Sequence, residues 1–292
     1  MWADILITGL PAGCIYALVA ASFNILYRPS NVFNFAQGDL VMLGAMLFAS
    51  LQAAGVLPWW GSLAVSLLLV GALAIAIEQI AVRPVLSRST HSHAWIITTL
   101  AVSMIIGNVA GKVWGADPIP VQPPLGLSTE PMKIAGLLIP SYQIALVVFT
   151  VVLIAIIEVL YSSRTGRAII AVAENRDAAL LRGIDPSSLR RWSFFLGGAL
   201  AALTGYLAAP ILFASPALGA TLLLKGFAAA ALGGLGSNKG ALAAGILIGI
   251  TESTSAALLT SGYQNAVILA VVLIVLLAKP QGIFGHSNTR AV

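Results

Sequence analysis

Residues 141–192 read SYQIALVVFTVVLIAIIEVLYSSRTGRAIIAVAENRDAALLRGIDPSSLRRW and change character in the middle. The first part, Ser141–Tyr161, is mostly apolar and contains one charged side chain, Glu158. Because about 20 apolar helical residues cross the ~30 Å core of a bilayer, this part predicts a membrane span. The second part gathers nine charged residues: Arg164, Arg167, Glu174, Arg176, Asp177, Arg182, Asp185, Arg190 and Arg191. A membrane helix that leads into a charged loop is therefore the first predicted unit of the fold.

The composition of the chain extends this prediction to the whole protein. Of 292 residues, 59% are hydrophobic and 9% are charged, whereas soluble domains average about 45–50% apolar and about 25% charged residues. Such a chain has too little polar surface for a large soluble all-α protein, so we predict an integral membrane protein. The start, MWADILITGL, lacks the basic residues of a signal peptide and is expected to stay as a membrane helix. Cys14 is the single cysteine, which excludes an intrachain disulfide.

Nine apolar segments predict an all-α, polytopic membrane helix bundle that forms one transmembrane domain over residues 1–292. Six segments are long enough to cross a bilayer: Asp4–Tyr27, Phe35–Ala54, Trp60–Val82, Ala94–Trp114, Ser141–Tyr161 and Trp192–Leu212. Gly240–Leu258 and Gln264–Ala278 raise the number to eight. Leu222–Leu235 is short for a full crossing and is either a tilted span or a re-entrant element, which protein or a cavity must surround. The prediction is therefore eight to nine spans.

Positive charge in the short loops predicts the orientation. With nine crossings, twelve Lys and Arg residues fall on one side: Arg28, Arg83, Arg88, Arg164, Arg167, Arg176, Arg182, Arg190, Arg191, Lys239, Lys279 and Arg290. The other side receives Lys112 and Lys133, which Asp117 and Glu130 offset. Because cytoplasmic loops carry the excess of Lys and Arg, the N-terminus is expected outside, and the C-terminus and the loop of residues 162–191 inside. The net charge of +5 follows from this bias and requires no nucleic-acid partner.

Proline and glycine predict one loop and several helix contacts. The outer loop, residues 115–140, contains six prolines, which favour an ordered, extended connector or a landing surface for an outside partner. Small-xxx-small pairs, which let membrane helices approach closely, occur at Gly107–Gly111, Gly236–Gly240 and Gly245–Gly249. A further small-residue face contains Gly197, Gly198 and Gly205.

We find no sequence motif of an enzyme. LGGLGSNKG, residues 232–240, differs from a phosphate-binding loop because Gly240 stands where Ser or Thr should follow Lys239. His91 and His93 lack the i, i+4 spacing of metal ligands on a helix, and there is no cysteine cluster. We therefore expect no catalytic, metal or cofactor site in this chain.

Polar side chains inside apolar segments are the candidates for a translocation path, since charges there are costly and usually face a bundle interior or an aqueous cavity. They are Asn34, Gln37, Asp39, Lys225 and Glu252. The last two have opposite charges and can compensate each other if they meet. Asn34 is expected to be a helix N-cap and Asp39 to favour the positive end of that helix; the alternative is that this cluster lines or supports the path. Glu78 and Glu158 lie near the ends of their segments and are expected to reach the polar surface.

The charged loop contains a short predicted helix. Asn175 is expected to cap its start, Gly183 fits the left-handed position that ends helices, and Pro186 prevents the helix from resuming. A short helix at a membrane surface is a poor independent unit, so we expect a partner. The surrounding arginines favour a charged partner and an anionic membrane surface equally.

DAALLRG, residues 177–183, resembles the EAA loop of ABC importer permeases, although aspartate replaces glutamate and the downstream I-x-L-P portion is absent. That resemblance implies an ATPase-coupling helix with Glu174, Asp177, Ala178, Ala179, Leu181, Arg182 and Gly183. GLPAGCIYALVAASFNILY (9–27), NFAQGDLVMLGA (34–45) and KGFAAAALGGLGSNKGALAAGILIGITES (225–253) resemble the H-type permeases of branched-chain amino-acid ABC importers. The resemblance covers nearly the whole chain. Gln37 departs from it, because histidine is expected there.

The resemblance implies an importer in the bacterial inner membrane. It would contain a second permease chain, two ATPase subunits that bind ATP, and an extracytoplasmic substrate-binding protein, all in contact with membrane lipid. The cargo would be branched-chain or other amino acids, with urea or short amides as the alternative. The rival function is an ion-coupled secondary transporter, which predicts stronger internal repeats, and a channel would require a filter or charge ring. Co-purification with an ATPase separates the importer from both.

Overall fold

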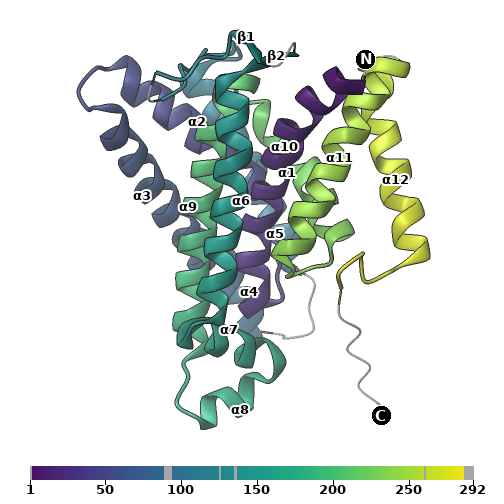
Figure 1. The fold of residues 1–292 in the computed structure, drawn as a ribbon. Coiled ribbons are helices and arrows are strands. Elements are labelled where there is room, and N and C mark those ends of the chain that lie inside the picture. Colours follow the sequence, from purple (N-terminus) through teal and green to yellow (C-terminus); the bar gives the residue numbers. More distant parts are fainter. Residues whose placement is uncertain (1, 89–93, 125, 135–136, 260, 286–292) are drawn as a thin grey trace. The chain divides into compact units, whose positions relative to one another are not determined.

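The computed structural model describes residues 2–88, 94–124, 126–134, 137–259 and 261–285, and these are mostly helical (Figure 1). The first half contains α1 (Trp2–Ser30), α2 (Gln37–Ala53), α3 (Trp59–Ile77), the π-helix η1 (Glu78–Val82), α4 (Arg83–Arg88), α5 (Ala94–Trp114), and the strands β1 (Pro131–Ile134) and β2 (Leu137–Pro140). The second half contains α6 (Ser141–Ser162), α7 (Arg164–Glu174), α8 (Arg176–Leu181), α9 (Pro186–Leu212), α10 (Leu218–Gly233), α11 (Asn238–Leu258), the 3-10 turn η2 (Ser261–Tyr263) and α12 (Gln264–Ala278).

All nine apolar segments predicted from the sequence are helical. Six helical stretches are long and apolar enough to cross a bilayer: Trp2–Ser30, Trp59–Leu86, Ala94–Trp114, Ser141–Ser162, Pro186–Leu212 and Asn238–Leu258. The helices α2, α10 and α12 have 17, 16 and 15 residues, fewer than the ~20 that a perpendicular span requires. The protein is therefore an all-α, polytopic membrane protein, and the count of eight to nine spans is not confirmed.

Two helix boundaries differ from the sequence prediction by six residues each. α9 begins at Pro186, six residues before the predicted start at Trp192, with Asp185 as its N-cap. Proline is favoured in the first turn of a helix because the N–H it lacks has no partner there, so Pro186 opens the next helix as well as ending the loop. The helix predicted to end at Val82 continues through η1 and α4 to Arg88.

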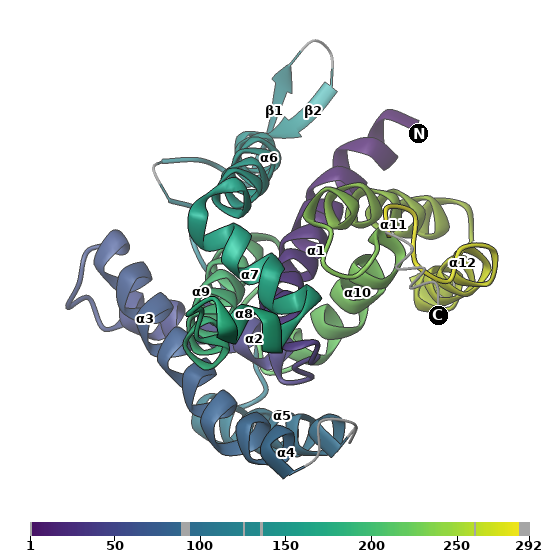
Figure 2. The same ribbon diagram turned by 90° about the horizontal axis from the view of Figure 1, so that it is seen from below.

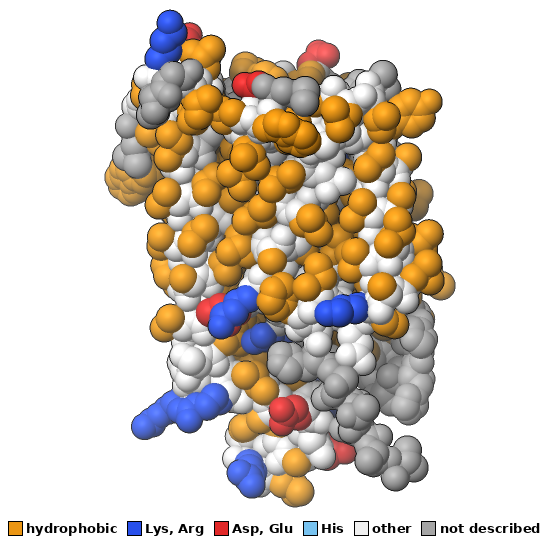
Figure 3. All heavy atoms as spheres, turned by 45° about the vertical axis from the view of Figure 1, so that its right-hand side comes forward, with side chains coloured by type: hydrophobic (Ala, Val, Ile, Leu, Met, Phe, Trp, Pro, Cys, Tyr) orange, Lys and Arg blue, Asp and Glu red, His pale blue; other side chains and the backbone are white. Residues whose placement is uncertain are grey.

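The chain forms two compact units. The first comprises Met1–Asn24, Ser128–Ile157 and Lys225–Val292, and the second comprises Ile25–Leu127 and Glu158–Leu224. Large apolar side chains remain exposed on both, for example Met104 at 69%, Leu273 at 60% and Leu277 at 75%. Figure 3 shows one face of the molecule, over most of which hydrophobic side chains predominate. An apolar outer surface of this kind suits a lipid environment.

Glycine allows close backbone contact in the first unit. A Cβ on Gly13 would lie 2.7 Å from the Gly245 carbonyl oxygen, and Gly249 faces the backbone of Gly9 and Gly13. α1 and α11 therefore touch backbone to backbone, which confirms the packing role predicted for Gly245–Gly249.

The second unit uses the same device between α9 and two of its neighbours. Gly205 lies against the backbone of Val41 and Ala45 in α2, and Gly198 lies against Ala74 in α3. Phe48 and Tyr206 fill the space beside this contact, with their ring centroids 4.5 Å apart. The small-residue face predicted on α9 is thus confirmed.

The other two predicted small-residue pairs differ in the described part of the chain: Gly107–Gly111 joins no two helices closely, whereas Gly240 of the second pair lies against the backbone of Gly233 and so brings α10 and α11 together. A Cβ on Gly111 would meet nothing within 4 Å, and one on Gly107 would meet only Asp39 Oδ1, at 3.7 Å. Gly236 has a φ of +84° and lies in the turn between α10 and α11. Glycine is favoured there because it adopts a positive φ without steric cost. Spacing alone cannot tell such uses from helix packing.

The proline-rich loop has more structure than an extended connector. β1 and β2 pair in antiparallel register, from Pro131 opposite Pro140 to Ile134 opposite Leu137. Figure 2 shows this hairpin beyond the end of α6. Proline usually disfavours strands because it cannot donate to the ladder. The hairpin forms here because both prolines lie at the strand ends, where no ladder hydrogen bond is lost.

Candidate functional site

Three polar side chains of the first unit meet where α1, α10 and α11 approach, and we call them the Lys–Glu–Tyr cluster. Lys225 Nζ donates a hydrogen bond to Glu252 Oε1 at 2.5 Å. Tyr16 donates its hydroxyl to Glu252 Oε2 at 2.5 Å and accepts a hydrogen bond from Lys225 Nζ at 3.1 Å. The sequence offered this pair only as a possibility, and the structure brings it together.

The cluster is enclosed but not sealed. The side chain of Lys225 is 10% exposed and that of Glu252 is 14% exposed. Lys225 and Tyr16 lie near the middle of their helices, far from the ends where long side chains can reach water. An ionised group at such a depth needs an opposite charge or hydrogen bonds, and the cluster supplies both.

Asp39 lies in the second unit, in the first turn of α2, and is 7% exposed. Ser103 Oγ of α5 donates a hydrogen bond to Asp39 Oδ2 at 2.5 Å. Two glycines approach the other oxygen closely: a Cβ on Gly219 would lie 3.0 Å from Oδ1 and one on Gly107 3.7 Å. Within the described ranges Asp39 makes no ion pair, so it is a buried carboxylate that accepts a hydrogen bond from Ser103.

The predicted N-cap at Asn34 is wrong. The helix starts at Gln37 with Ala36 at the N-cap position, and Ala36 makes no side-chain cap. Asn34 instead closes a tight turn before the helix, since its Oδ1 accepts from the Ala36 N–H at 3.1 Å. Gln37 Nε2 donates to the Gly197 carbonyl oxygen at 2.9 Å, and both amide side chains are buried. Asn34 and Gln37 therefore support the start of α2 from inside the protein.

Sequence reasoning missed a second buried ion pair. Arg190 Nε of α9 donates to Glu78 Oε1 at 2.5 Å, with side chains 8% and 0% exposed. The expectation that Glu78 reaches the polar surface is therefore wrong, because its carboxylate turns into the protein toward Arg190. A glutamate in an apolar segment signals that a cation is needed, but the six arginines of the loop are indistinguishable in sequence.

The charged loop folds into α7 and α8 and then enters α9. Asn175 caps α8, as predicted, since its Oδ1 accepts from the N–H groups of Asp177 and Ala178 at 3.1 and 3.0 Å. Gly183 has a φ of +78°, which confirms the predicted left-handed end. Asp185 caps α9, and hydrogen bonds from the Ser187 hydroxyl and N–H hold the pKa of its carboxyl below the ordinary value. Local sequence signals therefore placed the Asn175 cap and the Gly183 end correctly, whereas the Asp185 cap was not predicted.

The outward face of α8 is apolar at its tip. Leu181 is 90% exposed and Leu180 is 51% exposed. Ala178 is also exposed, whereas Ala179 is 3% exposed. Of the two alanines expected to face a partner, Ala179 thus packs inside the loop. Beside α8, a shallow groove is lined by Arg164, Thr165, Ala168, Ile184, Asp185, Ser188 and Leu189.

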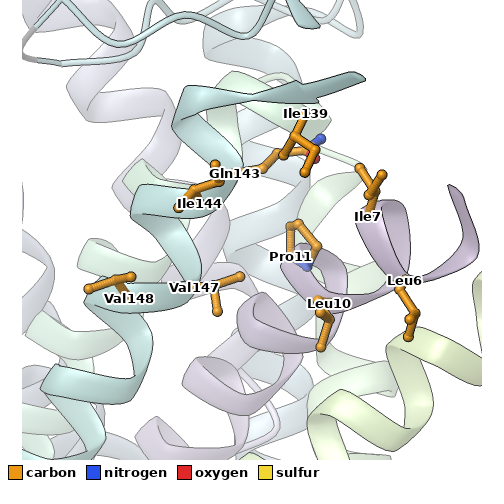
Figure 4. A pocket seen from close by; sticks show the side chains of 9 residues that line it. All are labelled: Leu6, Ile7, Leu10, Pro11, Ile139, Gln143, Ile144, Val147 and Val148. Atoms are coloured by element: carbon orange, nitrogen blue, oxygen red, sulfur yellow. The ribbon is translucent and has the colours of Figure 1, made fainter. Parts of the chain in front are cut away.

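A separate apolar pocket lies in the first unit between α1, β2 and α6 (Figure 4). Its lining is Leu6, Ile7, Leu10, Pro11, Ile139, Gln143, Ile144, Val147 and Val148. Gln143 is its only polar side chain, and its Oε1 is buried without a hydrogen-bond partner among the described residues. No residue predicted to be functional lines this pocket.

Some sequence predictions fall outside the described residues. They concern His91 and His93, the Arg290 charge, and the side chain of Arg88. Among the residues that are described, no three His, Cys, Asp or Glu side chains gather as a metal site would require.

The helices, the ion pairs buried within them and the apolar outer surface define a polytopic membrane protein with charged groups inside it, which is the class to which membrane transport proteins belong. The chain belongs to the family described as the permease component of branched-chain amino acid transport systems, whose model matches residues 5–277.

Named relatives agree with this family over almost the full length. The chain is 32% identical to the high-affinity branched-chain amino acid transport system permease protein LivH of Escherichia coli K12, over 97% of this chain and 96% of that protein. It is 28% identical to BraD of Pseudomonas aeruginosa, over 98% and 97%. It is 31% identical to a probable branched-chain amino acid transport permease protein LivH of Methanocaldococcus jannaschii, over 93% and 89%. No solved structure matches the chain significantly.

Proposed function

We propose that this chain is a transmembrane permease subunit of an ATP-driven importer of branched-chain or related amino acids in the inner membrane. The family match over residues 5–277 carries the proposal, together with relatives named as branched-chain amino acid permeases. The chain would form the translocation path with a second permease chain. Two ATPase subunits would bind the ATP, and an extracytoplasmic protein would deliver the cargo.

The same proposal fixes an orientation. Nine crossings, with α2, α10 and α12 as shorter or tilted elements, leave the N-terminus outside and the C-terminus in the cytoplasm. This arrangement keeps twelve Lys and Arg residues on the cytoplasmic side and two outside. It is tested by tagging each terminus and measuring protease access in sealed, right-side-out vesicles. Protection of an N-terminal tag would contradict it.

The coupling role is proposed for α8 and its flanks, that is Glu174, Asp177, Ala178, Leu181, Arg182 and Gly183. The supporting feature is an apolar tip in an otherwise charged loop: Leu181 is 90% exposed although its helix is capped at Asn175 and stopped at Gly183. A rigid, exposed leucine suits a groove on a soluble subunit, because burying it there removes apolar area from water.

The decisive experiment compares two glycines that both have a positive φ. Gly183 and Gly55 have φ values of +78° and +65°, and a Cβ on either meets nothing within 4 Å. G183V and G55V thus introduce similar backbone strain, about 1–2 kcal/mol, at different places. We expect both to insert into the membrane, G55V to co-purify with the ATPase, and G183V to lose it. Equal ATPase recovery with both variants would contradict the coupling role.

A second pair of variants tests the outward face of α8. A178W adds bulk where the side chain is exposed, and A179W adds it where the side chain is 3% exposed. We expect A178W to keep the permease folded and to block ATPase association, whereas A179W destabilises the loop itself. Normal association of A178W would place the partner's surface elsewhere.

The path is proposed to contain Asp39, Lys225 and Glu252, with Asn34 and Gln37 supporting it. Because Gln37 is 0% exposed, a cysteine at position 37 in a C14A background is expected to react with water-soluble thiol reagents only during turnover. Absence of reaction in every nucleotide state would leave Asn34 and Gln37 as structural groups alone.

The alternative functions are separated by energy source and cargo. An ion-coupled carrier would take up solute in vesicles without ATP, whereas the importer requires ATP and the partner ATPase. Binding assays on the partner binding protein distinguish amino acids from urea or short amides, since that protein is expected to choose the cargo.

A further inference from the structure

The Lys–Glu–Tyr cluster has the chemistry of a receptor for an amino acid. Lys225 presents an ammonium, Glu252 a carboxylate, and Tyr16 a hydroxyl that contacts both. We propose that this cluster is a binding site for zwitterionic amino acids, in which the Lys225–Glu252 pair opens and each partner binds the opposite charge of the ligand. This inference rests on the proposed import of amino acids.

Charge balance makes the exchange feasible inside a membrane protein. The closed cluster contains one cation and one anion at 2.5 Å. A zwitterion adds one of each, so Lys225 can pair with the ligand carboxylate while Glu252 pairs with the ligand ammonium. No charge is left unpaired before or after binding, which avoids the large penalty for an isolated charge in a low-dielectric interior.

Tyr16 can keep the opened groups oriented. Its hydroxyl donates to Glu252 Oε2 and accepts from Lys225 Nζ, while Oε1 of Glu252 is engaged by Lys225. When the ligand ammonium replaces Lys225 at Oε1, Tyr16 retains Oε2 and fixes the carboxylate. Lys225 has three N–H donors, and in the part of the chain that the structure describes, its hydrogen bonds go to Tyr16 and Glu252 alone.

Location separates this cluster from the other buried pair. Glu78 and Arg190 lie where α3 ends and where α9 begins, close to the charged loop. Glu78 is also fully buried, at 0% exposed, whereas Glu252 is 14% exposed. The Glu78–Arg190 pair therefore suits a fixed brace, whereas the carboxylate of Glu252 in the Lys–Glu–Tyr cluster keeps some exposure.

The proposed site should prefer ligands that carry both an ammonium and a carboxylate. An amino acid satisfies Lys225 and Glu252 together. An amine without a carboxylate leaves Lys225 unpaired, and a carboxylic acid without an ammonium leaves Glu252 unpaired. Because buried polar groups left without partners are strongly unfavourable, both analogues should be poor ligands.

The test uses the assembled importer in proteoliposomes with leucine as the cargo. K225M/E252Q removes both charges while keeping similar side-chain volumes, and E78Q/R190M is the matched control at the other pair. We expect leucine uptake per assembled complex to fall at least about tenfold in K225M/E252Q, which corresponds to about 1.4 kcal/mol, and to stay within about threefold in E78Q/R190M. Uptake by K225M/E252Q within about twofold of wild type would overturn the proposal and leave the pair as charge compensation.

A second measurement needs no variant and therefore decides the case if K225M/E252Q does not assemble. A hydrophobic carbodiimide modifies carboxyl groups inside membranes, and peptide mass spectrometry follows Glu252 and Glu78 in the wild-type complex. We expect leucine to slow the modification of Glu252 several-fold and to leave Glu78 unchanged. Equal modification of Glu252 with and without leucine, in every nucleotide state, would overturn the site.

The two proposals fail differently. If the wild-type complex takes up no amino acid under ATP, the proposed function fails and the site fails with it. If wild type takes up leucine while K225M/E252Q does so equally well, the importer stands and only the zwitterion site is overturned.

Discussion

The contact between α1 and α11 gives the sharpest stability prediction, because it depends on one missing methyl group. In G249A the new Cβ would lie 2.5 Å from Gly13 Cα, whereas carbon atoms attract best at about 3.5–4.0 Å. The two helices must therefore separate by about 1 Å. The matched variant is G111A, whose Cβ meets nothing within 4 Å.

The unfolding free energy is expected to change in opposite directions in G249A and G111A. Overpacking in a tight interior destabilises by about 1–3 kcal/mol, and alanine in place of glycine within a helix returns about 0.5–1 kcal/mol. G249A should therefore lose up to about 2.5 kcal/mol of unfolding free energy, and G111A should gain about 0.5–1 kcal/mol. At about 2–4 °C per kcal/mol, Tm should fall by up to about 10 °C in G249A and rise slightly in G111A.

The protein supplies its own reporter for this measurement. Cys14 is the only cysteine in the chain and is 0% exposed, so a fluorogenic maleimide reacts with it only as the protein unfolds. Melting curves of the purified permease in detergent then compare the two variants with wild type. A G249A protein that melts at or above the G111A protein would refute the close backbone contact.

Three further predictions follow from local contacts. Neutralising one partner of the Glu78–Arg190 pair (E78Q or R190M) should destabilise by about 3–5 kcal/mol, because a buried charge is left unpaired, and the double variant should recover part of this loss, as a double-mutant cycle of melting temperatures would show. The lowered pKa of Asp185 means that its cap stabilises α9 fully above the ordinary carboxyl pKa and is lost as pH falls through the lowered value. Hydrogen-exchange protection of the Ser187 amide, corrected for intrinsic exchange, should accordingly be retained at about pH 5 and decrease toward about pH 3. Protection that does not depend on pH would contradict the cap. N175A should weaken α8 by about 1 kcal/mol and reduce ATPase recovery, whereas unchanged recovery would show that the partner itself orders the helix.

Local signals in the sequence determined much of this protein. Runs of apolar residues placed the nine apolar helices, because a helix in lipid must present an apolar surface along its whole length. The caps at Asn175 and the left-handed Gly183 were also predictable, since each depends on hydrogen bonds or dihedral angles within a few residues. Motifs distributed over the chain predicted the permease family.

The tertiary structure alone decided which polar groups meet. Lys225 and Glu252 could be guessed as a pair from their charges, but the contribution of Tyr16, from a helix far away in sequence, depends on how α1, α10 and α11 pack. The pairing of Glu78 with Arg190 among six loop arginines has the same origin. Glycine spacing likewise predicted contact equally for Gly107–Gly111 and Gly245–Gly249, yet only the second pair brings two helices together. The physical reason is common to all three cases: a sequence fixes what a side chain needs, whereas the distance between helices determines which partner meets that need.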